Sequence, residues 1–545
     1  MTMKRSVPLR LRIQWLCRLP VACLLAGAAT VSVAAQAGPA PALPRFDIYQ
    51  YVVDGNSVLD ALAIEGAVSP FLGERKTLVE VEAARAALEK RYHDAGYLTV
   101  VVSIPDQAVD SGEVSLHVVE AVIDRLKVKG AEYTLPSAVK AGVPELAEGQ
   151  VPNFNRIQTQ LAALNRGADS RVTPVLRAGK LPGTVEVQLD VDDQLPLHGS
   201  VELSNRQTHN TTSARLSGAL RYDNLWQLGH SLGLTLQMAP QRPSDARVAA
   251  ATYVAPLGPG GDALSVFVLH SRSEFASLAS APGLGLLGNT DNLGLRYTLP
   301  LGGGVDFSQT LAAGLDYKNV KQTLLVLGGG NTDSPIAYAP VQTSYSANWL
   351  GGGGLSGRRT ALELGTTLGF RGLLGNRDTA FHAKRAGASA NFMSLRAGGL
   401  HSEPLGGWML LGKLDSQFAS GPLVPNEQFT AGGAENVRGY LEGERAADAG
   451  LRASLELRTP AYQPAGVNSD WRVSALGFVD GARLKTLQPV APLPAWHRLL
   501  GIGLGLRLSA PRGLTLEADA AQALVDGDST KARHKRLHAR AVWGF

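Results

Sequence analysis

The sequence predicts a transmembrane β-barrel of about 16 antiparallel strands, preceded by two small α/β modules. Three observations favour this fold class. The C-terminal residues 535–545 alternate between apolar and mostly cationic side chains and end on an aromatic ring. From residue 194 onward, similar period-two segments recur. After the N-terminal signal no run of about 18 apolar residues occurs, although 45% of the chain is hydrophobic, which excludes a helical membrane protein.

The C-terminal segment has two different faces. Successive side chains of a strand point to opposite sides of its sheet. One face carries Leu537, Ala539, Ala541, Trp543 and Phe545, and the other carries Arg536, His538 and Arg540. A strand of about 9–11 residues with one apolar face suits a wall between lipid and a polar interior. A soluble hairpin edge is the alternative for this segment alone.

Residues 1–37 form a predicted secretory signal peptide, cleaved after Ala35 or Ala37. Five of the 52 basic residues lie in it, so the mature chain carries 47 basic against 47 acidic residues. This balance gives no argument for nucleic acid binding. Both cysteines, Cys17 and Cys23, also lie in the signal. The mature chain therefore has neither disulfides nor thiolate chemistry, which suits passage through an oxidising periplasm.

Two modules of similar order follow the signal, at 46–121 and 122–193. The first has a strand at 46–53, a helix at 79–93 and strands at 98–104 and 114–119. The second has a strand at 123–128, a helix at 154–164 and strands at 171–176 and 185–191. Each copy reads strand, helices, strand, strand over about 70–75 residues, so we interpret them as repeats of one unit.

Residues 194–545 are predicted to form the barrel. Spread over 16 strands, these 352 residues give about 22 per strand and connection. The expected strands are 197–206, 212–222, 229–239, 246–256, 262–273, 289–299, 306–318, 341–351, 359–370, 386–397, 406–418, 449–460, 471–483, 498–509, 513–522 and 535–545. Only 18% of residues are charged, against ~25% in typical soluble domains. A lipid-facing surface hidden by alternation explains this composition.

The connections between these strands alternate in length. Turn-rich short ones occur at 256–260, 300–303 and 510–513, and long ones at 319–340, 371–385 and 419–448. Short periplasmic turns alternating with long external loops are typical of outer-membrane barrels. A soluble β-sandwich gives no reason for such sorting.

Several motifs together carry a family resemblance. Gly96 and Tyr97 precede a strand in the first module, and Pro105 and Gln107 follow it. The other matches are Val437-Arg438-Gly439-Tyr440 in the longest loop, Phe478 and Asp480 on the thirteenth strand, and the C-terminal Trp543 and Phe545. This set resembles the outer-membrane transporters of two-partner secretion, the ShlB/FhaC/HecB family. The modules would then be POTRA domains, and the C-terminal aromatic would be the signal read by the barrel-assembly machinery.

The resemblance makes Val437–Tyr440 a loop tip and Asp480 its partner on the barrel wall. Arginine presents a planar fork of donors that a carboxylate accepts bidentately. Because a 16-stranded barrel encloses water, a long loop inside it needs an anchor. We therefore expect Arg438 to reach inward and pair with Asp480. The alternative is a solvated loop arginine and an independently satisfied strand aspartate.

The sequence departs from the family pattern in two places. Gly481 follows Asp480 directly, and Ala482 stands where the family often has glycine. Well-known members carry an N-terminal plug helix, but only about eight residues separate Ala37 from Phe46. We therefore expect plug-helix gating to be absent.

Signals of enzymatic or metal chemistry are weak. Residues 229–233 match the glycine–serine elbow of hydrolases, but alternating apolar residues follow where that elbow needs a helix. Residues 283–288 fit a dinucleotide fingerprint without the surrounding βαβ unit. His534 and His538 share a strand face without further ligand-type neighbours. We expect no enzyme activity, no cofactor and no metal.

The resemblance implies a monomeric conduit in the bacterial outer membrane with its modules in the periplasm. Its partners would be one secreted exoprotein of haemolysin or adhesin type, outer-membrane lipid and, during biogenesis, the barrel-assembly machinery. The modules would capture the extended substrate by lending a strand edge. A barrel-assembly insertase of BamA or TamA type is the main alternative, and a passive porin is a third.

Overall fold

The structure, a computed structural model, describes residues 44–545 except 110, 166, 259, 278–284, 305, 322, 325–331, 334, 352–356, 464–470 and 491–492. The predicted signal peptide, the segment before residue 44 and residues 283–284 of the 283–288 motif lie outside the described residues, and residues 285–288 of that motif begin strand β14. The chain divides into two compact units, one within the first 118 residues and one that contains most of the rest, including the barrel.

The N-terminal module packs helices on a small sheet. Its elements are β1 (Phe46–Ile48), β2 (Gln50–Asp54), α1 (Ala61–Val68), η1 (Ser69–Phe71), β3 (Gly73–Lys76), α2 (Leu78–Asp94), β4 (Val101–Ser103) and β5 (Glu113–Val119). The sheet order is β2-β5-β4, and β2 runs parallel to β5. One face of α2 is fully buried through Val81, Ala84, Leu88 and Tyr92, as the helical spacing predicted.

The second module has a similar plan. Its elements are β6 (Val122–Lys129), α3 (Pro136–Ala141), η2 (Pro144–Leu146), α4 (Phe154–Leu164), β7 (Ser170–Ala178) and β8 (Thr184–Asp193). The sheet order is β6-β8-β7, again with a parallel first pair. Asn153 caps α4 by accepting hydrogen bonds from two backbone N–H groups. The core lies between this helix and the sheet, around Ile157, Val187 and Leu189.

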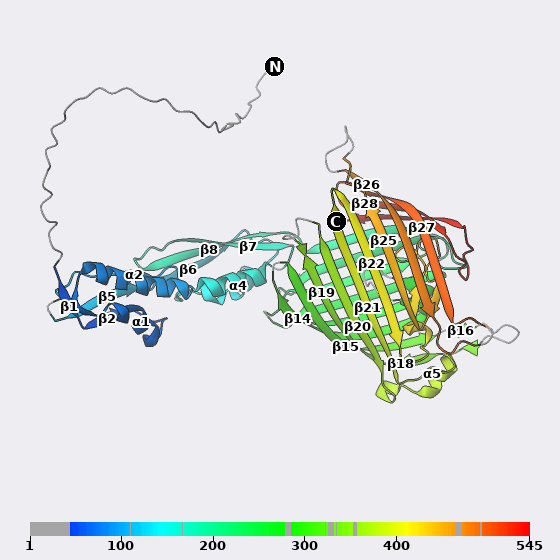
Figure 1. Cartoon of the computed structure of the whole chain (residues 1–545), viewed down its shortest axis with the longest axis horizontal. Coiled ribbons are helices and arrows are strands. Elements are labelled where there is room, and N and C mark those ends of the chain that lie inside the picture. Colours follow the sequence, from blue (N-terminus) through cyan, green and yellow to red (C-terminus); the bar gives the residue numbers. More distant parts are fainter. Residues whose placement is uncertain are drawn as a thin grey trace, which may run out of the picture. The chain divides into compact units, whose positions relative to one another are not determined.

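Most of the remaining strands form a closed barrel (Figure 1), and β16–β17 and β23–β24 form separate two-stranded sheets. The wall strands are β9 (Leu197–Ser204), β10 (Arg215–Leu225), β11 (His230–Met238), β12 (Ala246–Pro256), β13 (Ala263–Ser277), β14 (Gly285–Gly303), β15 (Phe307–Lys321), β18 (Ile336–Tyr338) with β19 (Pro340–Leu350), β20 (Arg359–Gly369), β21 (Phe392–Leu405), β22 (Trp408–Ala419), β25 (Ala449–Arg458), β26 (Arg472–Lys485), β27 (Trp496–Ser509), β28 (Leu514–Ala523) and β29 (Lys535–Gly544). Because β18 and β19 are consecutive and both pair with β15, the wall has 16 positions, all antiparallel, as predicted. The barrel closes where β29 pairs with β9.

Alternation separates an apolar outer face from a polar lumen. On β25, Leu455 is 55% exposed on the outside, whereas the next residue, Glu456, is buried on the inside. On β29, Leu537 and Trp543 are exposed and His538 is buried between them. The lipid-facing surface of the barrel is therefore made by alternate residues, many of them leucines, rather than by a continuous apolar run as in a membrane helix. No helix among the described residues is long and apolar enough to cross a membrane.

Most connections at the end of the barrel where β9 begins are short, such as 226–229 and 406–407, and the longest ones, such as 370–391 and 420–448, lie at the other end. The long connections hold η4 (Leu373–Gly375), α5 (Asp378–Lys384), η5 (Pro425–Glu427), β16 (Thr323–Leu324), β17 (Thr332–Asp333), β23 (Phe429–Ala431) and β24 (Arg445–Ala447). Two predicted boundaries differ markedly. Strand β14 continues through the expected turn at 300–303, and β21 begins at Phe392 rather than 386.

Candidate functional site

The longest connection, 420–448 between β22 and β25, folds into the barrel. Its two limbs pair as the hairpin β23–β24, and residues 432–444 form the tip. Gly439 in this tip has φ +97°, and a Cβ there would lie 3.0 Å from the backbone nitrogen of Ala523 on β28. Only glycine combines this backbone conformation with so close an approach to the wall.

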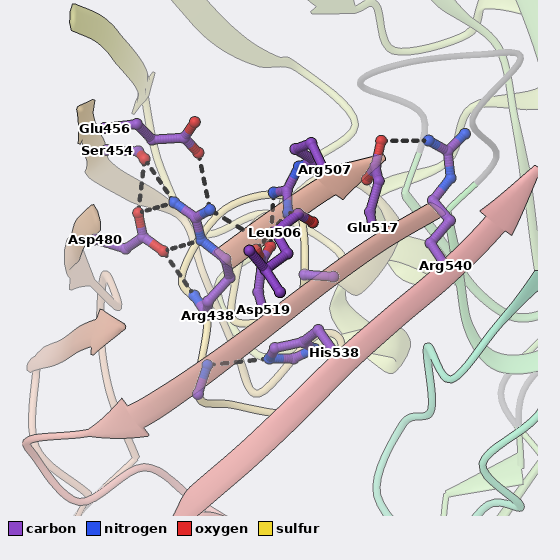
Figure 2. A network of polar contacts seen from close by, with 12 residues as sticks. Arg438, Ser454, Glu456, Asp480, Leu506, Arg507, Glu517, Asp519, His538 and Arg540 are labelled. Atoms are coloured by element: carbon purple, nitrogen blue, oxygen red, sulfur yellow. Dashed lines mark hydrogen bonds and ion pairs between the residues drawn. The ribbon is translucent and has the colours of Figure 1, made fainter. Parts of the chain in front are cut away.

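Arg438, at the loop tip, binds Asp480 on β26 (Figure 2). Its Nε lies 2.7 Å from one carboxylate oxygen and its Nη2 lies 2.8 Å from the other. The backbone N–H of Arg438 donates a third hydrogen bond, of 3.0 Å, to the same group. Asp480 is completely buried and Arg438 is 4% exposed. The structure therefore brings the two residues together in the bidentate arrangement that Arg recognition of a carboxylate favours.

Further wall residues surround the same guanidinium, as Figure 2 shows. Its Nη1 lies 2.8 Å from Glu456 of β25 and 3.5 Å from Asp519 of β28. The hydroxyl of Ser454 donates to Asp480 over 2.6 Å. Arg507 in turn binds Asp519 through both terminal nitrogens, at 2.6 and 2.9 Å. The sequence analysis did not predict these partners. Their signal in the sequence is that each is a polar residue between two outward-facing apolar or small residues of a wall strand.

The electrostatics favour a charged, fixed arginine. Burial by itself lowers the pKa of Arg438, but the hydrogen bond and charge of Asp480, with Glu456 and Asp519, raise it above its ordinary value. Phe478 lies beneath the guanidinium, 3.4 Å from its carbon to the ring centroid. A cation over an aromatic face adds to the attraction. Phe478 therefore acts with Asp480 as one receptor surface for the arginine.

The neighbours of Arg438 in the tip make separate contacts. Val437 is fully buried in an apolar cluster with Phe429 and Leu484. The backbone N–H of Gly439 donates to Nε2 of His538 over 3.1 Å, which requires that nitrogen to be unprotonated. The Tyr440 hydroxyl oxygen lies 3.0 Å from the carbonyl oxygen of Leu500 on β27 and 2.7 Å from that of Val525 in the β28–β29 connection. All four residues of the tip motif thus contact the wall.

A second anchor holds the base of the loop, and sequence reasoning missed it. Asp448 is completely buried and accepts hydrogen bonds from Arg385, which binds through both terminal nitrogens, and from the backbone N–H groups of Leu423 and Leu487. On the other limb, Glu427 accepts from Lys318 at 2.6 Å and from Tyr338 at 2.7 Å. Apart from Leu423 in the loop itself, these partners come from two other connections, through Arg385 and Leu487, and from wall strands β15 and β18.

The remaining predicted wall residues lie at different places. Gly481 points outward from β26, next to Leu500. Phe545 follows β29 and exchanges two backbone hydrogen bonds with Gly199, of 2.9 and 3.0 Å, at the barrel seam. The indole N–H of Trp543 donates to a turn carbonyl over 3.0 Å, and its ring lies 5.2 Å from that of Phe545.

The predicted module residues have local structural roles. Gly96 ends α2 with φ +98°, and the N–H of Tyr97 donates back to a helix carbonyl over 3.0 Å, which caps the helix. The Gln107 side chain pairs with the backbone of Ser115 on β5, accepting at 2.6 Å and donating at 2.8 Å. It also donates to the carbonyl of Pro105 over 3.3 Å. These residues fix the module rather than form a chemical site.

Two further signals find ordinary structural explanations. Ser231 of the glycine–serine elbow lies within strand β11, opposite Val254, so the strand-to-helix turn of a hydrolase elbow is not formed. Within the described ranges, Asp169, His198 and Asp223 bring potential metal ligands within 4.8 Å of one another. His198 bonds Asp169 at 2.9 Å and Arg221 bonds Asp223 at 2.9 Å, so ion pairing accounts for the group.

The lumen beside the loop is open. A cavity of about 1280 Å³ is bordered by the loop and by wall strands β12–β15 and β19–β22, with both cationic and anionic side chains. Glu363, Arg296 and Arg396 line it from the wall, and Glu435 lines it from the loop. A smaller cavity of about 290 Å³ borders Arg438. The loop therefore lies against β26–β29 and leaves space on its other side.

Comparison with known proteins gives two family matches. Residues 46–121 match the POTRA domain, ShlB-type. Residues 183–508, more than half of the chain, match the family described as haemolysin secretion/activation protein ShlB/FhaC/HecB.

Curated relatives carry one description. The outer membrane transporter CdiB of Escherichia coli O6:K15:H31 (strain 536 / UPEC) is 25% identical over 181 residues, 33% of this chain. This match spans 30% of that relative. The outer membrane transporter CdiB of Dickeya dadantii (strain 3937) is 23% identical over 450 residues, 81% of this chain and 76% of the relative.

Solved structures show the same fold. CdiB from Escherichia coli aligns with a TM-score of 0.61 and 20% identity over 95% of this chain and 93% of its own. CdiB from Acinetobacter baumannii aligns with a TM-score of 0.57 and 16% identity over 92% of this chain and 90% of its own. BamA from Haemophilus ducreyi lacking POTRA domains 1–3 aligns with a TM-score of 0.55 and 15% identity over 92% of this chain and 100% of its own.

Proposed function

The chain belongs to the haemolysin secretion/activation ShlB/FhaC/HecB family of outer-membrane, two-partner secretion transporters, and we propose that it exports one large unfolded exoprotein through its barrel. Its barrel lies in the outer membrane and its N-terminal modules lie in the periplasm. The observation that carries the proposal is the loop fixed to one side of the lumen by a buried Arg438–Asp480 pair. A loop held in this way leaves a polar passage beside it.

The two modules supply candidate strand edges for capture. We treat 122–193 as a second POTRA domain because it repeats the parallel first pair and sheet order of the first. Strands β2 and β6 each lie at a sheet edge and pair on one side only. Edge β7 contains Pro174, which interrupts its donors. The edge of β6 is already occupied, because Ile123 exchanges backbone hydrogen bonds with residues 149 and 150 and the N–H of Leu126 donates to Glu148. The edge of β2 is therefore the proposed site of substrate pairing, where main-chain hydrogen bonds tolerate varied sequence.

The passage suits an extended chain in water. The cavity of about 1280 Å³ has acidic and basic side chains around it, so neither charge sign of a passing peptide is excluded. The Arg438 anchor faces β25, β26 and β28, away from most of this cavity. We propose that the substrate moves between the loop and the wall of β13–β22, and that folding outside the cell prevents its return.

A depletion experiment tests this function. Loss of the chain from its host should remove one large polypeptide from the culture medium and leave the other outer-membrane barrels at normal abundance. Mass spectrometry of the medium and of the membrane fraction measures both quantities. A general decline of outer-membrane barrels would instead indicate an insertase.

One observation favours that second candidate. The seam between β29 and β9 is short: only residues 540–544 pair with 200–204, whereas β26 pairs with β27 over fourteen positions. A short seam is a weak point at which nascent strands can enter. The passive porin differs again, because its solute permeability should survive deletion of residues 46–193.

A further inference from the structure

A cationic patch lies on the outer face of the barrel at the ends of β26 and β27. Arg483 and Lys485 end β26, and Trp496 and Arg498 begin β27. The register places Arg483 opposite Arg498 and Lys485 opposite Trp496. These positions share the outward face with Val479, Leu500 and Ile502, which are 47%, 38% and 45% exposed. We call the four residues Arg483, Lys485, Trp496 and Arg498 the outer patch.

The outer patch lies at the cell-surface end of the barrel. Strand β9 follows the second module directly after residues 194–196, so it begins at the periplasmic end of the barrel, and antiparallel neighbours alternate in direction. As the thirteenth wall strand, β26 runs the same way as β9, so its last residues reach the outer surface. Ten residues separate Arg498 from the outward Leu508 near the other end of β27. At ~3.3 Å per residue and a tilt of ~40°, this spans ~25 Å, the height of a barrel's apolar band.

The cations of the outer patch lack acidic partners. Arg483 and Lys485 contact the Trp496 ring, at 4.4 and 5.3 Å from its centroid, and no described carboxylate forms an ion pair with Arg483, Lys485 or Arg498. The described outward positions of β25–β29 include neither Asp nor Glu. Like charges directly opposite each other destabilise a sheet. The arrangement therefore provides a site for an anion.

Its surroundings point to a lipid as the source of that anion. Below the patch, Leu504 is 71% exposed and Leu506 is 56% exposed on the same face of β27. A surface of this kind contacts acyl chains, and an aromatic ring at its border is typical of the membrane interface. We propose that Arg483, Lys485 and Arg498 bind the phosphate groups of a phosphorylated lipid of the outer leaflet, with Trp496 packed against the same molecule.

The test uses the full-length mature protein in neutral detergent micelles. Native mass spectrometry measures binding of diphosphoryl lipid A to the parent and to R483Q/K485Q/R498Q. We expect the apparent Kd to rise at least tenfold in the triple variant. It should stay within twofold for the charge-conserving R483K/R498K and for Lys129→Gln, an exposed lysine of the second module. Heat-modifiable migration on a gel verifies that each variant is folded. If the triple variant does not fold, the single variant R498Q replaces it, and we expect its apparent Kd to rise about threefold.

Two further arms separate the sources of phosphate. Lipid A stripped of phosphate should bind at least tenfold more weakly than the diphosphoryl form, and inorganic phosphate should not compete at equal concentration. Equal binding by the triple variant, equal binding of the dephosphorylated lipid, or full competition by inorganic phosphate would each overturn the proposal. None of these outcomes depends on export, so the test is independent of the proposed function.

Discussion

Loss of the Arg438–Asp480 pair should release the loop tip, and a thiol can report the release. The chain from Gly38 onward has no cysteine, so Val437→Cys introduces a single one. Val437 is completely buried beside Arg438. A maleimide reagent therefore modifies this cysteine only when the tip leaves the wall, and the modification rate follows the open population.

The structure sets the size of the effect. Removing one partner of a buried pair costs ~3–5 kcal/mol. The lower end applies here, because a cavity of about 290 Å³ borders Arg438 and admits water. About 3 kcal/mol corresponds to a roughly 150-fold larger open population, since each ~1.4 kcal/mol is a factor of ten. Arg438→Ala should raise the modification rate by that order. Asp480→Ala should raise it less, because Glu456 and Asp519 still hold the arginine.

The double variant decides whether the two residues act as a pair. Arg438→Ala/Asp480→Ala should cost at least ~1.5 kcal/mol less than the two single costs combined, because each single variant already breaks the shared contact. Arg458→Ala is the matched control: its guanidinium is 37% exposed and, among the described residues, bonds only Glu456, so its effect should stay below ~1 kcal/mol. Multiplicative rates in the double variant would refute the reasoning.

The remaining predictions concern the same loop. Tyr440→Phe removes the hydroxyl that bonds the backbone of Leu500 and Val525 and should weaken loop closure by ~1–3 kcal/mol, whereas Tyr462→Phe, at a 64% exposed site, should leave thiol reactivity unchanged. Gly439→Ala forces a side chain into a positive φ against the wall and should cost ~1–3 kcal/mol in the same assay; an unchanged rate would show that the tip is not closely packed. Asp448→Ala leaves the partly buried Arg385 without its carboxylate and should lower the unfolding temperature more than Asp480→Ala does, because it also frees two backbone donors, those of Leu423 and Leu487. An equal or smaller loss would contradict a second anchor.

Periodicity predicted the barrel well because its signal is local. Outward leucines on β25 and β27 alternate with small or polar inward residues, and both strands lie within three residues of their expected bounds. The failures are also physical. Residues 386–391 alternate in character, yet they belong to the connection after α5, whose Ser389 and Ala390 bond Asp378. Side chain to backbone bonds of this kind leave no periodic mark.

The candidate site was predictable only in part. The Arg438–Asp480 contact followed from a motif resemblance, and periodicity alone placed Asp480 on the inward face. Glu456 on the adjacent strand β25 and Asp519 on β28, two strands away, share that inward parity, so a register would have identified them. The Arg385–Asp448 contact joins residues 63 positions apart in irregular connections, where neither alternation nor a motif indicates a partner.

Cross-linking during export tests the central claim, that a polypeptide passes through the lumen beside the loop. Glu363 lines the large cavity, and the next residue, Leu364, is 42% exposed on the opposite face of β20. A photoactivatable residue at 363 should capture the exported polypeptide in transit, and the same group at 364 should capture none. Capture from 364 alone, or equal capture from both positions, would contradict passage through the barrel.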